Sequence, residues 1–141
     1  MNTMATEGVL GGYYAWSKYP TIYAKSVNLS RKLKDAYNSA LDEFDLLVMP
    51  TTTSPANPLP PADGTPSQFK DTQRGTVDNT GQFDMTGHPA LAVPIGFVPA
   101  AECDSIMLPA SMQIVGRFWD EGTILRAAYA WEGQVDWKAE Q

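Results

Sequence analysis

Few side chains in this chain could do chemistry, and His88 is the first to consider. It is the only histidine and lies between Gly87 and Pro89, where it could act as a general base. Asp78 or Asp84 could be its carboxylate partner. No serine lies in the G-x-S-x-G elbow of a Ser-His-Asp hydrolase, so His88 has no evident nucleophile beside it. We interpret it as a turn histidine with a local hydrogen bond, and the aspartates as capping or loop residues. A small enzyme built on His88 remains the alternative.

Hydroxyl groups gather at residues 51–54, which read Thr-Thr-Thr-Ser after an apolar run. They could contact a ligand, because ligand sites of α/β folds lie beyond the carboxyl ends of strands. Turn and capping hydrogen bonds are the preferred interpretation. Ser17 and Lys18 are adjacent, so their side chains diverge and form no Ser-Lys pair. The aromatic residues near the end are interpreted as core rather than as a cofactor cage: Phe118, Trp119, Tyr129 and Trp131.

Metal and cofactor motifs are missing from the sequence. There is no HExxH, no CxxC and no glycine-rich phosphate loop, so we expect no metal site and no cofactor. Cys103 is the only cysteine and cannot form an internal disulfide, which favours a reducing compartment.

Composition and charge exclude further classes of function. The net charge is −6 and basic residues do not cluster, which argues against nucleic acid as a partner. The start resembles no secretory signal, and no run of eighteen apolar residues occurs, so we expect a cytoplasmic protein without membrane contact. A hydrophobic content of 43% is too high for disorder and predicts a folded chain.

The elements that must position these residues follow from periodicity and from the prolines. Residues 1–141 are long enough for a single domain with its own core. Apolar residues at helical spacing and short apolar runs predict an α/β fold. The predicted elements are a helix over 18–44, a strand over 45–50, a long Pro-rich loop over 51–82, strands over 90–97 and 106–116, and a helix over 120–132, which Asp120 would cap.

Three blocks of sequence then carry a resemblance. Residues 45–51 read DLLVMPT, residues 79–94 include NT and FDMTGHPALAVP, and residues 108–125 begin LPASMQIVGR. In this order they resemble the carboxy-terminal part of amidase-signature hydrolases, over about half of the chain. The resemblance implies a partial amidase-signature fold, with a mixed sheet of about three to four strands, flanking helices and the long Pro-rich loop.

The resemblance also implies a chemistry. The family forms an acyl-enzyme with a nucleophilic serine, while a second serine in a cis peptide and a lysine move the protons. No position of this chain matches that motif, so no catalytic residue is carried over. The resemblance assigns a wall of the substrate pocket to Asp78, Asn79, Thr80 and Phe83, and a structural turn to Gly87 and Pro89. The family often has Asn where Asp84 stands.

Besides a small enzyme built on His88, the sequence leaves two functions open. The first is the carboxy-terminal part of an amidase, which would take a small-molecule amide once the missing amino-terminal region completes it and would be inactive alone. The second is a non-catalytic binding or interaction module that keeps the amidase scaffold and docks on a partner chain. Strands over 46–49 and 90–94 are apolar on both faces, so in isolation they would expose apolar sheet surface and favour self-association or a partner chain.

Overall fold

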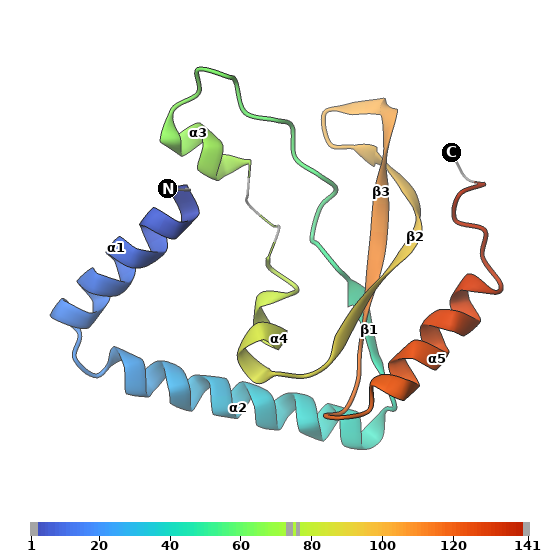
Figure 1. Cartoon of the computed structure of the whole chain (residues 1–141), viewed down its shortest axis with the longest axis horizontal. Coiled ribbons are helices and arrows are strands. Elements are labelled where there is room, and N and C mark those ends of the chain that lie inside the picture. Colours follow the sequence, from blue (N-terminus) through green and yellow to red (C-terminus); the bar gives the residue numbers. More distant parts are fainter. Residues whose placement is uncertain (1–2, 73–74, 76, 140–141) are drawn as a thin grey trace.

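Helices surround a small sheet in this chain, as a computed structural model shows for residues 3–72, 75 and 77–139 (Figure 1). The α/β class expected from the sequence is confirmed. In chain order the elements are α1 (Thr3–Lys18), α2 (Ile22–Glu43), β1 (Leu47–Pro50), α3 (Pro66–Asp71), α4 (Gly81–Thr86), β2 (Ala90–Ala100), β3 (Cys103–Val115) and α5 (Glu121–Glu132).

The strand β3 lies at the centre of the sheet, whose order is β1-β3-β2. Both pairings are antiparallel, so β1 and β2 run in the same direction on opposite sides of β3. The mixed sheet that the resemblance implied is therefore antiparallel across these three strands. β1 pairs only with residues 112–115 of β3, whereas β2 pairs along nearly its whole length. The outer part of the hairpin thus extends beyond β1.

The core lies between the sheet and α5. Val93 and Ile114 pack against Ile124 and Ala128 of α5, and these four residues are at most 8% exposed. The indole nitrogen of Trp131 donates to the carbonyl of Pro94 at 3.1 Å, which satisfies its polar end. The helix α5 is therefore fixed to the inner end of the hairpin.

A second contact joins α2 to α4. The rings of Tyr37 and Phe83 have their centroids 5.0 Å apart, and Phe83 is buried. Arg117 follows β3 and donates to the Asp45 carboxylate and to the Phe44 carbonyl, which ties the end of α2 to the end of the central strand. Leu41 near that end is 2% exposed.

The boundaries of the helices differ more from the sequence-based expectations than those of the strands do. Instead of one helix over 18–44, the chain forms α1 and then α2, separated at residues 19–21. Pro20 disfavours helical geometry in the preceding residue, which ends α1. Glycines at positions 8, 11 and 12 lower helix propensity and obscured α1 in the sequence.

The predicted loop over 51–82 also contains helical turns. The segment includes all of α3 and the start of α4, so it is not irregular throughout, contrary to what the sequence had indicated. Thr65 and Gln68 form a reciprocal capping box around Pro66, and this arrangement starts α3. Between β1 and α3 the chain has no regular secondary structure, in keeping with its prolines.

The hairpin is longer than the two strands expected over 90–97 and 106–116. A two-residue turn joins β2 to β3, which brings the extra residues into the ladder. Register shifts at Pro94/Gly96 and Pro99/Ala100 accommodate the prolines, which cannot donate to a ladder. The helix expected over 120–132 spans Glu121–Glu132. The Asp120 carboxylate accepts from the Thr123 hydroxyl at 2.7 Å rather than from a backbone N–H.

Two expectations about burial require correction. Val48 of β1 is 61% exposed, so this apolar strand is covered on one face only. Trp119, expected in the core, is 91% exposed and has a left-handed φ of 65°. Tyr129 is 81% exposed, whereas Phe118 packs on His88.

The tight packing at Gly116 gives a stability prediction. A Cβ there would lie 2.9 Å from Ile124 Cγ1 and 3.0 Å from its Cδ1, in the core beneath α5. We expect Gly116→Ala to lower the free energy of unfolding by about 1–3 kcal/mol, the usual cost of overpacking. Chemical denaturation measures this change.

Gly122 in α5 provides the matched control. A Cβ at Gly122 would have no neighbour within 4 Å. Gly122→Ala should therefore stabilise the protein by about 0.5–1 kcal/mol through helix propensity. Equal effects of the two substitutions would contradict the packing described for Gly116.

Candidate functional site

The predicted pocket-wall segment is anchored at the carboxyl end of β1. The side-chain amide of Asn79 donates to the carbonyl of Pro50 at 2.8 Å. The amide of Gln113 donates in turn to the backbone carbonyl of Asn79 at 2.7 Å. Gln113 is 4% exposed and lies on β3 opposite Met49 and Ala92. The centre of the sheet therefore fixes the position of the backbone at Asn79.

The other predicted wall residues have different surroundings. Phe83 is 5% exposed and packs on Tyr37, so its ring belongs to the interior in this structure. Thr80 precedes α4 without a side-chain capping bond and is partly exposed, and Asp78 is exposed. The structure thus brings Asp78 and Thr80 to the surface on either side of the anchored Asn79.

The hydroxyl run at 51–54 lies next to this anchor. Thr52 Oγ1 donates to the Ser54 carbonyl at 2.8 Å, and Thr53 Oγ1 donates to the Gly75 carbonyl at 3.4 Å. These contacts are ordinary turn chemistry. Thr51 differs, because its buried hydroxyl has no hydrogen-bond partner within the described residues. An unsatisfied buried hydroxyl is costly, and this one lies at the end of β1, directly after Pro50.

His88 is buried between the end of α4 and the start of β2. It is 4% exposed, Nδ1 lies 2.9 Å from Thr86 Oγ1 and Nε2 lies 3.1 Å from Asn38 Oδ1. A neutral ring with its proton on Nε2 satisfies both contacts, because the Thr86 hydroxyl donates to Nδ1 and Nε2 donates to Asn38. Burial lowers the pKa of His88, and the charge of Lys34 lowers it further.

These contacts do not form the His88–carboxylate pair considered from the sequence. The ring nitrogens contact a hydroxyl and an amide, and the ring stacks on Phe118 at a centroid distance of 4.3 Å. Asp84 is exposed. Gly87 ends α4 with a left-handed φ of 79°, and the carbonyl of Pro89 accepts from the N–H of Gly116 at 3.1 Å. His88 therefore holds α2 against the start of β2.

Sequence reasoning missed Gln113 and Asn38. Gln113 carried a signal, since it is a lone amide within the apolar run of β3 and a buried amide requires a partner. Asn38 carried none, because its contact with His88 spans fifty positions of sequence.

No three His, Cys, Asp or Glu side chains come close enough to hold a metal ion in the described part of the chain. Over the same residues, no helix has the length and apolar character needed to cross a bilayer.

Comparison of this sequence with known proteins identifies the family of the chain. The amidase family model matches residues 4–125, and the chain is therefore a member of the amidase family. It is 36% identical over 121 residues to an enantioselective amidase of Rhodococcus rhodochrous, covering 84% of this chain and 22% of that protein. It is 31% identical over 137 residues to one of the subunits of the glutamyl-tRNA(Gln) amidotransferase of Methanosarcina mazei, covering 96% of this chain and 26% of that protein.

A third relative is shorter. An uncharacterized protein in the nthA 5' region of Rhodococcus erythropolis is 41% identical over 110 residues, which cover 78% of this chain and 52% of that protein. The chain thus spans about half the length of one relative and about a quarter of the other two.

The environment of His88 predicts a pH dependence of stability. Because its pKa is lowered in the folded state, the unfolded chain, with a histidine pKa near 6.5, binds the proton first as pH falls. Stability should be full above pH 6.5 and decline below it. Urea denaturation between pH 7.5 and 5.5, a range above most carboxyl titrations, measures this decline.

A variant without the imidazole is the control. His88→Gln should be less stable at pH 7.5 but should show little change over the same range, because His88 is the only histidine. A decline of equal size in both proteins would show that another group titrates.

Proposed function

We propose that this chain forms the carboxy-terminal part of an amidase that hydrolyses carbon–nitrogen amide bonds through an acyl-enzyme. Its role is to supply one wall of the amide pocket, while the serine nucleophile, its cis serine and the lysine belong to the remainder of the protein. Membership of the amidase family and the share of each relative that the chain spans support this proposal.

One observation carries the pocket-wall role. The backbone at Asn79 is held by Gln113 and by the carbonyl of Pro50, so Asp78 and Thr80 lie at fixed positions beside the end of β1. A specificity wall needs such rigidity, since a misplaced contact loses most of its effect on rate.

The proposal predicts that the chain alone does not turn over amides. We expect no hydrolysis of aliphatic or aryl amides above buffer by the purified 141-residue chain. Hydrolysis that persists through repurification and is lost on substitution of a serine of this chain would contradict the proposal.

Complementation is the positive arm of the same experiment. The enantioselective amidase of Rhodococcus rhodochrous, truncated before the region that matches this chain, is mixed with the chain or fused to it. Ammonia release measured by a coupled assay should appear only when both parts are present. Failure of both the mixture and the fusion, with both parts folded by circular dichroism, would argue against the role.

Substitutions in the wall should alter substrate recognition in the active fusion. We expect Asp78→Ala and Thr80→Ala to change KM or amide preference by about three- to tenfold, the effect of losing one or two hydrogen bonds to the substrate. Asp136→Ala, in the exposed tail after α5, is the control and should leave both unchanged. Identical kinetics for all three variants would remove the wall role.

The second candidate function is a non-catalytic module that docks on a partner chain. The exposed apolar surface favours it, notably Val48 of β1 at 61% and Tyr13 and Trp16 of α1 at 76% and 67%. The relative in Methanosarcina mazei is itself described as a subunit. Recovery of one stoichiometric partner together with failure of complementation would favour this function.

A further inference from the structure

We propose that the cavity between the Pro-rich segment and the tip of the β2–β3 hairpin binds a small molecule with an apolar body and one cationic group, such as an arylalkylammonium ion. The cavity has a volume of about 410 Å³, within the usual range of small-molecule sites. It is separate from the pocket wall at 78–83, so the inference does not depend on the proposed function.

The local sequence explains why a cavity exists here. β1 ends at Pro50, so no strand among the described residues lies beside the outer half of β3 on that edge. The chain that passes there contains Pro55, Pro58 and Pro60, which cannot donate to a ladder and hold their neighbours extended. The Asn57 amide donates to the Thr72 carbonyl at 2.9 Å and fixes this segment to the end of α3. The segment therefore stands away from the hairpin instead of pairing with it.

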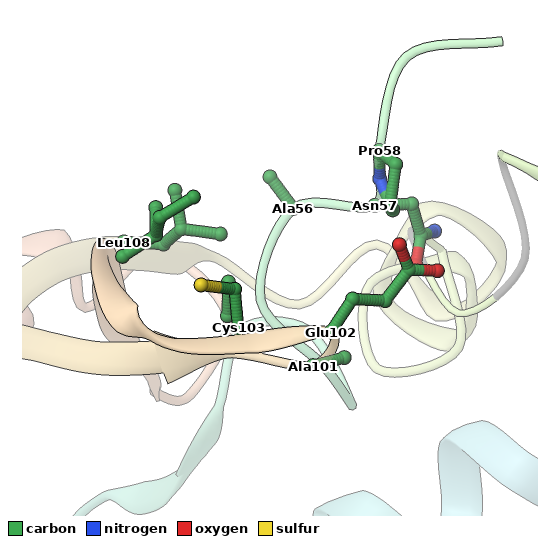
Figure 2. Close-up of a pocket in the computed structure, with 9 residues that line it drawn as sticks. Ala56, Asn57, Pro58, Ala101, Glu102, Cys103 and Leu108 are labelled. Atoms are coloured by element: carbon green, nitrogen blue, oxygen red, sulfur yellow. The ribbon is translucent and has the colours of Figure 1, made fainter.

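The walls of the cavity are mainly apolar. Ala56 and Pro58 line one side, and Ala100, Ala101, Ile106 and Leu108 line the other. Figure 2 shows the Leu108 side chain and the Cys103 sulfur at one end of the hairpin wall, opposite Ala56. These groups favour a hydrocarbon or aromatic body, because it would replace water against their surface.

The other end of the cavity is polar and acidic. Figure 2 shows the Glu102 carboxylate directed toward the Asn57 side chain. Glu102 is the only charged residue among the nine that line the cavity. A second hollow of about 310 Å³ shares Glu102 and Asn57 and adds Asp71. A carboxylate only accepts hydrogen bonds, so this end suits an ammonium group and disfavours an anion. The net charge of −6 acts in the same direction.

The experiment uses 2-phenylethylammonium as the probe and the full chain labelled for NMR. Its neutral and anionic counterparts are 2-phenylethanol and 3-phenylpropionate. We expect amide shifts at Asn57 and at residues 101–103, with a dissociation constant on the order of 1 mM for a ligand of this size. The neutral alcohol should bind more weakly, and the anion should give no saturable shift.

Two variants test the contacts. Glu102→Gln should weaken binding of the cation by about two- to fivefold, the effect of an exposed ion pair, and should leave the alcohol unchanged. Glu121→Gln on α5 is the matched control and should bind like the wild type. Leu108→Trp should fill the cavity and abolish the shifts, with folding verified by circular dichroism.

Three results would overturn the proposal. The first is the absence of shifts at the hairpin tip at 10-fold above the expected dissociation constant. The second is equal binding of the anion and the cation, and the third is equal weakening by Glu102→Gln and Glu121→Gln. The wild-type titration alone decides the first two, so the test does not require that any variant folds.

Discussion

The two-sided pairing of β3 is the constraint on which the rest of this structure depends. Its inner residues form ladders with β1 and β2 at once, so Gln113 is enclosed between Met49 and Ala92. An amide so placed loses its water and must find another partner. It finds the carbonyl of Asn79, and the most buried strand thereby determines where a surface segment lies. One hydrogen bond thus satisfies a buried amide and fixes a surface segment.

As a consequence, packing is dense around one part of the sheet, while apolar side chains are exposed elsewhere. Around the inner end of β3, side chains from α2, α4 and α5 are closely packed, and Val115 has no exposed surface. Away from it, α1 exposes aromatic residues, and on the uncovered face of the sheet β1 exposes Val48. Such surfaces are unusual for a protein that acts alone. They suit the proposed role as part of a longer amidase, in which further polypeptide would cover them.

The sequence predicted those parts of the fold that depend on local chemistry. Continuous apolar runs indicated β1 and the inner hairpin, and a helical stripe indicated α2. The capping box of Thr65 and Gln68 was also readable and would have revealed α3. The glycines of α1 weakened its signal because they lower helix propensity. Asp120 lay where a cap was expected, but its carboxylate took the nearer hydroxyl of Thr123.

The candidate site was less predictable than the fold. The resemblance directed attention to Asp78, Asn79 and Thr80, but periodicity could not show that Asn79 contacts Pro50 across twenty-nine positions. His88 was expected to make a local hydrogen bond, and its contact with Thr86 is local. Its second contact with Asn38 depends on how α2 packs beside α4, which only the assembled fold determines.

The β2–β3 hairpin extends past the end of β1, so its inner part and its turn differ in how freely the sequence can change length. The inner ladder cannot gain or lose a residue without reversing which face Gln113 presents, since side chains alternate along a strand. The outer turn at Ala101 and Glu102 has no such restriction, because it lies beyond β1. A change in the length of this turn leaves the pairing of β1 and β2 with the inner residues of β3 as it is, so Gln113 keeps its place beside Met49 and Ala92.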